Sequence, residues 1–436
     1  MSHWYSLRYY LLPVLLVAIL AGCTGGAPRL PQEGPVVATA TVSHTSEVEV
    51  FSWWTRGRES AGLDALLKVL AQRHPEIQFV NAAHAGGSDA EARAALVERL
   101  QAGAPPDSWQ APVGQASIAS YGSAGYLEPL NFLFEQQGWS QVLPKTLIPL
   151  LESNGNVYAV PTAVHRGNIL WYNPQVLAAH NVAVPQTQED LFAALDAFKA
   201  AGMEAPLALG EQWTVMHLLE TVLLASLGPD AYQGLWTGDT AWDGAEVAQA
   251  LANFARLLTY ANTDNADLTW EQAGKRLVEG QAAFYVMSDW LEPYLKGQGL
   301  QPQQDFGWTT FPGTKGAFQF LAEGFVLATE ASHRAEGVAW LEAVGSREGQ
   351  QAFNLAGGAM PARLDVDRAP FDVYWQAAMD DWATGKVVGS LVHGVVARDD
   401  WRSEIEAALT QYLASSDLAS FQQGLAAACE EAGPCS

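Results

Sequence analysis

Tryptophan is the residue type in this chain that is best suited to binding a ligand. The sequence contains 16 Trp, 13 Tyr and 16 Phe, and its tryptophan content is far above ordinary usage. Several rings lie where a predicted strand ends, as Trp53 and Trp54 do, and ligands of α/β proteins bind at the ends of strands. Most of the other aromatic side chains are expected to fill the core. The pattern therefore indicates a binding site built on aromatic rings.

The sequence lacks the short motifs of well-known hydrolases and nucleotide-binding enzymes. It contains no GxSxG nucleophile motif, no HExxH zinc motif, no Walker-type phosphate loop and no cluster of His and Cys with metal-ligand spacing. A secreted glycoside hydrolase would use a pair of carboxylic acids, but the acidic residues are scattered without such a constellation. The motifs searched for therefore give no support to an enzyme, and we expect neither a cofactor nor a bound metal.

The amino-terminal residues have the pattern of a bacterial lipoprotein signal. Residues 1–22 combine a basic start, a short apolar run over 11–20 and small residues before Cys23. The run is shorter than the roughly 20 apolar residues that a membrane-spanning helix needs. The segment Leu20-Ala21-Gly22-Cys23 looks like a lipobox, so we expect cleavage after residue 22 and lipidation of Cys23; an ordinary signal peptide with an incidental cysteine is the alternative.

A lipidated Cys23 would hold the rest of the chain at a membrane without spanning it. Residues 23–46 are rich in Gly, Pro, Thr and Ser, which is typical of a flexible tether. We therefore expect a lipid-anchored protein of the cell envelope, on the periplasmic or extracytoplasmic face. In that oxidising compartment the closely spaced Cys429 and Cys435 are predicted to form a disulfide.

Length and charge limit the fold and the partners. Hydrophobic residues make up 49% of the 436 residues, and the part after the tether exceeds one ordinary domain, so two lobes are expected. The net charge of −24 argues against nucleic acid as a partner, because its phosphates would be repelled. An acidic surface favours solubility and says little about the fold.

Strand and helix patterns alternate along the chain. In the first part they predict strands over 48–54, 77–80 and 107–110, separated by helices over 60–70 and 89–102. Later strands are predicted at 168–172, 206–209, 281–287, 306–311 and 324–327, with helices at 187–201, 212–227 and 244–261. This order predicts an α/β fold in which helices flank mostly parallel sheets.

A set of short segments, spread over the whole chain after the tether, carries a resemblance to a known family. In the first half they are Phe51-Ser52-Trp53-Trp54-Thr55, Leu100-Gln101-Ala102-Gly103, Pro106-Asp107-Ser108, Tyr158-Ala159-Val160-Pro161, Val164-His165-Arg166-Gly167-Asn168 and Leu170-Trp171-Tyr172-Asn173-Pro174. In the second half they are Leu268-Thr269-Trp270, Phe311-Pro312-Gly313-Thr314, Gly345-Ser346-Arg347-Glu348-Gly349-Gln350, Pro361-Ala362-Arg363 and Leu391-Val392-His393-Gly394. With these segments in this order, the chain resembles the family 1 extracellular solute-binding proteins of ABC importers, and most closely their glucose/mannose-binding group.

The resemblance implies a two-lobed periplasmic-binding-protein fold of type II, whose lobes are joined by crossing strands and close on a ligand. It places lobe 1 at 47–163 with 324–360, and lobe 2 at 164–323 with 361–436. It also implies a monomer that captures a sugar, either a glucose-, mannose- or galactose-like monosaccharide or a small oligosaccharide. The protein would deliver this sugar to the membrane permease subunits of an ABC transporter.

A sugar explains why aromatic and planar polar residues would share one site. A pyranose has an apolar face of C–H bonds, which an aromatic ring can cover, and a rim of hydroxyls. The resemblance favours the pair Trp53 and Trp54 at the site, although strand alternation turns one of them toward the core. Trp270 and Trp290, each near a predicted helix start, are the preferred stacking rings.

Planar polar groups would bind the hydroxyl rim through charge-assisted or bidentate hydrogen bonds. The resemblance matches Gln110 and His393 to ligand-binding residues of the family; for His393 a histidine buried in the core is the alternative. Glu59 either accepts from two hydroxyls or complements the dipole of the following helix. Asp289 either contacts sugar or caps its helix, and the capping role is favoured. His165 could either bind the ligand or hold the hinge, and the sequence does not decide between these two roles.

Several neighbouring residues bear on these assignments. Arg166 is expected to hold the hinge, and Thr269 with Gln272 predicts a capping box at the helix that Trp270 begins. Two residues differ from the glucose-binding group: Pro112 replaces a His, and Glu323 replaces an Asp before the last interlobe strand. Both changes would alter the hydroxyl pattern that the site accepts.

A polyamine- or metal-binding protein of the same fold is the main alternative to a sugar-binding protein, and a glycoside hydrolase is a further one.

Overall fold

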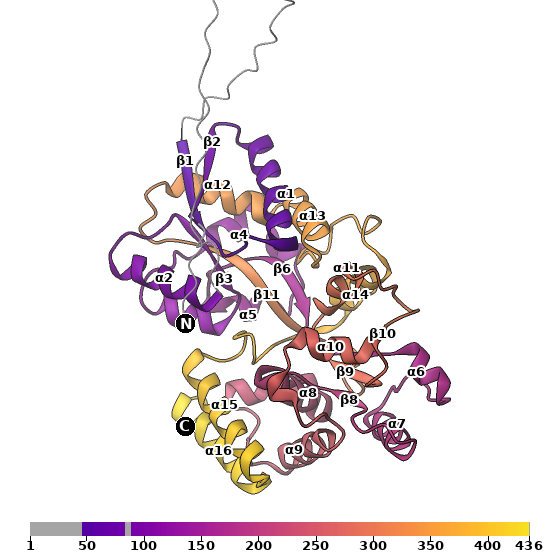
Figure 1. Cartoon of the computed structure of the whole chain (residues 1–436). Helices are drawn as coiled ribbons and strands as arrows, with labels where there is room; N and C mark the ends of the chain where they lie inside the picture. The colour runs from indigo at the N-terminus through magenta and orange to yellow at the C-terminus, as the bar shows by residue number, and fades with distance from the viewer. Residues whose placement is uncertain (1–45, 83–88, 436) are drawn as a thin grey trace, which may run out of the picture. The chain divides into compact units, whose positions relative to one another are not determined.

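The computed structural model of the chain describes residues 46–82 and 89–435 (Figure 1). The predicted signal segment, Cys23 and nearly all of the tether lie outside these residues. Among the described residues, no helix combines the length and the apolar character needed to cross a membrane.

The first sheet contains the strands that the sequence predicted at the start of the chain. Its strand order is β12-β11-β3-β1-β2, and β6 also pairs with β11. The strands are β1 (Ser46–Phe51), β2 (Ile77–Asn81), β3 (Ser108–Pro112), β6 (Val160–Arg166), β11 (Ala317–Leu327) and β12 (Lys386–Gly389). β1 is parallel to both β2 and β3, as the predicted β-α-β-α-β order requires. Val48 and Val50 are fully buried in the core beneath this sheet.

Helices cover the first sheet and link its strands. The two predicted crossover helices are α1 (Gly57–Arg73) and α2 (Asp89–Gln101), and α1 packs against α13. The remaining elements around this sheet are α3 (Gln115–Ser117), η1 (Ile118–Gly122), α4 (Asn131–Gln137), η2 (Trp139–Gln141), α5 (Ile148–Leu151), the hairpin β4 (Glu152–Ser153) and β5 (Asn156–Val157), α12 (Arg334–Gly345), α13 (Arg347–Gly357) and α14 (Val373–Thr384).

The second sheet is smaller, and its strand directions differ from the expectation of a mostly parallel sheet. Its order is β10-β7-β9-β8, with strands β7 (Ile169–Tyr172), β8 (Leu207–Ala208), β9 (Phe284–Val286) and β10 (Gly307–Thr310). Only β8 and β9 are parallel, whereas β7 is antiparallel to both β9 and β10. The chain enters this sheet through β7, directly after β6, and leaves it through β10 toward β11. Because β7 leads the chain into the sheet and the neighbouring β10 leads it out, these two strands run in opposite directions.

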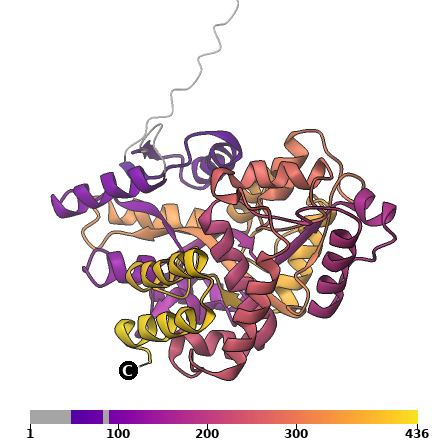
Figure 2. The same cartoon turned by 60° about the horizontal axis from the view of Figure 1, so that its bottom comes forward.

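Around the second sheet lie the helices α6 (Pro174–Ala179), α7 (Gln188–Ala200), α8 (Gln212–Thr237), α9 (Ala245–Leu258), η3 (Asn265–Asp267), α10 (Trp270–Val278), α11 (Leu291–Gly297), α15 (Asp399–Ser415) and α16 (Leu418–Ala432). Figure 2 shows the C-terminal helices beside the helices of the second sheet, and α16 packs on α9. A disulfide joins Cys429 to Cys435 at the end of α16, as the sequence predicted. α8 is interrupted at Gly228, where φ is +76°, so the predicted end at residue 227 coincides with a break in the helix.

Helix starts show where the capping predictions were right and where one was wrong. The capping box at α10 is confirmed: Thr269 N donates to Gln272 Oε1 (2.8 Å), and Gln272 N donates to Thr269 Oγ1 (3.4 Å). The predicted capping role of Asp289 is wrong. The N-cap of α11 is Trp290, and no side chain makes a capping bond there. The Asp289 carboxylate instead contacts His165 Nδ1 and Arg166 N, both on β6.

Three segments connect the first sheet to the elements of the second. Gly167 and Asn168 join β6 to β7, residues 311–316 join β10 to β11, and residues 390–398 join β12 to α15. The long strand β11 pairs with β12 through its first residues and with β3 through its last ones. The α/β fold has two lobes, and these three connections join the first sheet to the elements of the second.

Candidate functional site

A cleft of about 1120 Å³ is lined by residues from both lobes. One wall comes from the end of β1 and the start of α1, and the opposite wall comes from the starts of α8, α10 and α11 together with the 390–398 segment. Eight of the predicted ligand-binding residues line it: Trp53, Trp54, Glu59, His165, Trp270, Trp290, Glu323 and His393. The remaining two, Gln110 and Asp289, lie directly behind the wall.

Four half-buried tryptophans face this cleft, namely Trp53, Trp213, Trp270 and Trp290. Trp213 and Trp290 have ring centroids 6.2 Å apart, and Trp270 lies 5.1 Å from the ring of Tyr294. Their partial burial leaves ring surface open to the cleft, which is the arrangement that stacking on a ligand requires. Trp213 was not predicted, although it stands in the first turn of its helix just as Trp270 does.

The two tryptophans at the end of β1 take different environments. Trp54 is only 2% exposed and packs against the rings of Phe325 and Phe353, with centroid distances of 5.5 and 4.7 Å. Trp53 is half-buried and contributes to the cleft wall. Trp54 therefore mainly supports the wall, and Trp53 is the better placed of the two to contact a ligand.

Gln110 positions its neighbours and does not line the cleft itself. It is buried in the middle of β3, where its Oε1 accepts from Ser52 Oγ (2.8 Å) and from Trp53 N (3.2 Å). Its Nε2 donates to Glu323 Oε2 (3.2 Å), a carboxylate in the cleft wall. One amide thus fixes both the backbone at Trp53 and the carboxylate of Glu323.

Asp289 fixes His165 in the cleft wall. Its fully buried carboxylate lies 2.6 Å from His165 Nδ1 and accepts from Arg166 N at 2.7 Å. A carboxylate can only accept, so the proton of this contact belongs to Nδ1 of His165. The neighbouring Arg166 donates to Asn168 Oδ1 (3.0 Å) and to Asp381 Oδ2 (2.5 Å), and its role in a hinge stays a prediction.

His393 is an uncharged polar group at the centre of the aromatic wall. Its ring lies 5.3 Å from Trp290 and 6.2 Å from Trp213, both edge to face. Burial lowers the pKa of His393 to about 3, and the nearby His217 and Arg402 act in the same direction. The neutral ring has its Nε2 buried without a hydrogen-bond partner among the described residues. Such a group can donate to or accept from a ligand hydroxyl.

Charged groups complete the lining. Glu59 is exposed in the first turn of α1, where a carboxylate also complements the helix dipole, so both of its predicted roles fit its position. Four arginines, which the sequence reasoning missed, also line the cleft: Arg56, Arg58, Arg93 and Arg402. Guanidinium groups supply planar donors, whereas the carboxylates of Glu59 and Glu323 supply acceptors. The cleft therefore offers rings together with both donors and acceptors.

A buried carboxyl beside the cleft makes stability depend on pH. Glu292 on α11 is 1% exposed, and burial, reinforced by Asp372, raises its pKa to about 7 despite the ion pair with Lys296 (3.1 Å). The folded state therefore keeps a proton between about pH 4.5 and 7 that the unfolded state has lost, so the free energy of unfolding should fall as pH rises through this window. The expected fall is ~3 kcal/mol, at about 1.36 kcal/mol per pH unit.

Glu292→Gln should remove this fall. Urea denaturation at pH 4.5 and pH 8 measures it, with the difference between the two pH values compared in parent and variant. An unchanged difference in the variant would show that Glu292 does not cause the pH dependence.

Fold and cleft together define a class of protein, because two α/β lobes around a ligand-sized cleft are the architecture of a solute-binding protein. Residues 56–351 match the family of bacterial extracellular solute-binding proteins. The chain belongs to this family.

Two relatives and one solved structure illustrate the similarity. A probable sugar-binding periplasmic protein of Rhizobium meliloti is 31% identical over 369 residues, which cover 82% of this chain and 87% of the relative. An uncharacterised ABC transporter extracellular-binding protein of Pyrococcus horikoshii is 28% identical over 425 residues, covering 96% and 94%. The structure of a chitin oligosaccharide binding protein shares the fold with a TM-score of 0.73 and 20% identity, covering 88% of this chain and 98% of that one.

Proposed function

We propose that the protein is the sugar-binding subunit of an ABC-type importer. The observation that carries this proposal is the cleft with four half-buried tryptophans beside Glu59, Glu323, His165 and His393. Rings suit the C–H face of a pyranose, and the polar groups suit its hydroxyls. A relative named as a probable sugar-binding periplasmic protein supports the same ligand class. A polyamine or metal would call for clustered carboxylates, which this tryptophan-rich lining does not resemble.

The proposed ligand is a glucose-, mannose- or galactose-like monosaccharide or a small oligosaccharide. Pro112 and Glu323, the two residues that differ from the glucose-binding group, both line the cleft and would influence which hydroxyls are accepted. The lobes, with the boundaries proposed at 47–163 with 324–360 and 164–323 with 361–436, would close on the sugar and bind it without changing it. The closed, monomeric protein would then deliver the sugar to membrane permease subunits.

A thermal-shift screen against monosaccharides and disaccharides tests the proposed ligand class. A ligand that binds only the folded state raises the melting temperature by mass action, about 2.7 kcal/mol of stabilisation at 100 times the dissociation constant. We expect a clear shift with at least one sugar. A shift with polyamines or divalent metals and with no sugar would contradict the proposal, and turnover of the sugar to product would indicate a hydrolase.

We further propose that a lipid on Cys23 anchors the protein at the outer face of the membrane. Cys23→Ser should leave the body folded and able to bind sugar, but it should release the protein from the membrane fraction, because no thiol remains for acylation. Fractionation of cells that produce parent or variant measures this. Equal membrane retention of the serine variant would contradict lipid anchoring.

A further inference from the structure

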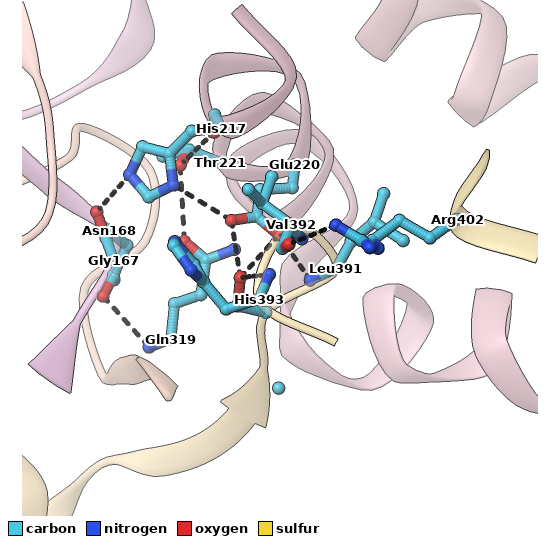
Figure 3. A network of polar contacts seen from close by, with 12 residues as sticks. Gly167, Asn168, His217, Glu220, Thr221, Gln319, Leu391, Val392, His393 and Arg402 are labelled. Atoms are coloured by element: carbon cyan, nitrogen blue, oxygen red, sulfur yellow. Dashed lines mark hydrogen bonds and ion pairs between the residues drawn. The ribbon is translucent and has the colours of Figure 1, made fainter. Parts of the chain in front are cut away.

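A buried carboxylate on α8 holds the segment that carries His393. Glu220 is fully buried, and its Oε2 accepts from Leu391 N at 2.5 Å and from Val392 N at 3.2 Å. Ser390 Oγ lies 2.9 Å from Oε1 of the same carboxylate. These three residues begin the connection between β12 and α15, and Figure 3 shows Leu391 and Val392 beside Glu220. One side chain thus anchors the whole start of this connection.

The same carboxylate is paired with a buried histidine. His217, one helical turn earlier on α8, is fully buried and places Nδ1 3.0 Å from Glu220 Oε1. Its Nε2 lies 3.0 Å from the carbonyl oxygen of Gly167. Both of these partners are acceptors, so both ring nitrogens must carry a proton to satisfy them. His217 and Glu220 therefore form a buried ion pair, with the imidazolium donating at both ends.

This ion pair contacts two of the three connections between the sheets. Gly167 belongs to the first connection, and a Cβ at this position would lie 2.8 Å from Gln319 Oε1 and 3.1 Å from His217 Cε1. Gln319, near the start of β11, accepts from Gly167 N through its carbonyl (2.9 Å) and from Thr221 Oγ1 through its side chain (3.3 Å). Residues of the β6–β7 and β12–α15 connections, together with Gln319 of β11, thus meet on one face of α8.

The network ends at a ring that lines the cleft. Ser390 Oγ, which donates to Glu220, accepts from His393 N at 3.3 Å. The rings of His217 and His393 are 6.3 Å apart and edge to face. Behind the loop, Arg402 Nη1 donates to Val392 O at 3.3 Å. The position of the His393 ring in the cleft therefore depends on an ion pair that does not itself line the cleft.

We propose that Glu220 and His217 are positioning residues that set ligand affinity by fixing the 390–393 segment, and with it His393, relative to the tryptophans of the cleft. This proposal rests on the proposed sugar-binding function. A buried ion pair costs desolvation and is often no more stabilising than an apolar pair, so specificity of the local geometry is a more plausible benefit than added stability.

The test is a double-mutant cycle on sugar affinity, made with Glu220→Gln and His393→Ala in the full protein. Glutamine keeps the size of the side chain but has one acceptor oxygen, so an amide NH₂ must face an N–H of His217, Leu391 or Val392. We expect Glu220→Gln to raise the dissociation constant about tenfold in the parent and less than about twofold in the His393→Ala background. Glu292→Gln, a matched change of a buried carboxylate that does not touch the segment, should change affinity less than about twofold in both.

Equal losses in both backgrounds would overturn the proposal, because they would indicate a general effect on the fold. An unchanged affinity in folded Glu220→Gln would overturn it as well. If Glu220→Gln does not fold, Ser390→Ala takes its place, since it removes one link and leaves the ion pair intact. It should raise the dissociation constant about threefold, again only when His393 is present.

Nitrogen-15 NMR of the histidine rings tests the same proposal without a sugar. The parent should show protons on both ring nitrogens of His217, and Glu220→Gln should shift the His393 ring signals while Glu292→Gln leaves them in place. A neutral His217, or His393 signals unmoved by Glu220→Gln, would contradict the positioning role. If no sugar binds the parent, the proposed function fails, but the NMR measurement still tests the positioning role of His217 and Glu220.

Discussion

Trp290→Ala is expected to raise the dissociation constant for sugar by about 30- to 150-fold while the protein stays folded. Trp290 lies within ring contact of His165 (5.6 Å), Trp213 and His393, so its indole joins the predicted polar groups to the other tryptophans of the cleft. Truncating a half-buried aromatic ring at the centre of a site costs about 2–3 kcal/mol of binding. Isothermal titration calorimetry measures the loss, with circular dichroism to verify folding.

Two further variants separate stacking from general damage. Trp290→Phe keeps an aromatic face and should recover most of the affinity. Trp308→Ala is the matched control, because Trp308 is a half-buried tryptophan that packs on Trp171 and Tyr374 and does not line the cleft. Parent-like affinity in folded Trp290→Ala, or an equal loss in Trp308→Ala, would contradict the assignment of Trp290 to the ligand site.

Asp289→Ala is expected to lower the free energy of unfolding by about 3–5 kcal/mol. The change leaves the Arg166 N–H buried without its acceptor and removes the partner of His165 Nδ1, and breaking a buried charged contact by removing one side is costly. Binding should weaken too, because His165 loses the contact that orients its ring. Urea denaturation followed by tryptophan fluorescence measures the stability change.

Asp289→Asn gives the sharper comparison. Its Oδ1 can still accept from Arg166 N, but its NH₂ faces His165 Nδ1 and requires that nitrogen to accept. The asparagine variant should therefore keep most of the stability while His165 changes tautomer. A loss of stability as large as that of the alanine variant would show that the His165 contact, and not the Arg166 backbone, carries most of the effect; no loss in the alanine variant would contradict the account.

Local patterns predicted β1, β2 and β3 of the first sheet and the capping box at α10 because neighbouring residues determine them; β6 and β12 were not predicted. The strand directions of the second sheet were missed, since they depend on where the chain enters and leaves the lobe. The role of Asp289 was missed for a related reason. A carboxylate before a helix suggests a cap, but here it reaches a strand 124 positions earlier in the sequence.

Most of the predicted binding residues do line the cleft, but residue type could not tell the wall from the layer behind it. Gln110 carried the resemblance to a ligand-binding residue, yet in the structure it fixes Trp53 and Glu323 from beneath. Trp213 fell within the predicted helix 212–227 and was not considered as a binding residue. The pair His217 and Glu220 was missed as well, although two ionisable residues three apart in a strongly apolar helix are a detectable signal of a buried polar contact.

The most direct test of the central claim is isothermal titration calorimetry of the purified protein with the sugars that the thermal screen selects. We expect saturable binding of one sugar per chain, with no product formed on prolonged incubation and with affinity reduced in Trp290→Ala. Two results would contradict sugar binding in this cleft. One is that no monosaccharide or small oligosaccharide binds at millimolar concentration. The other is that a sugar binds but its affinity stays unchanged in each of the variants Trp290→Ala, Trp53→Ala, Trp213→Ala and Trp270→Ala.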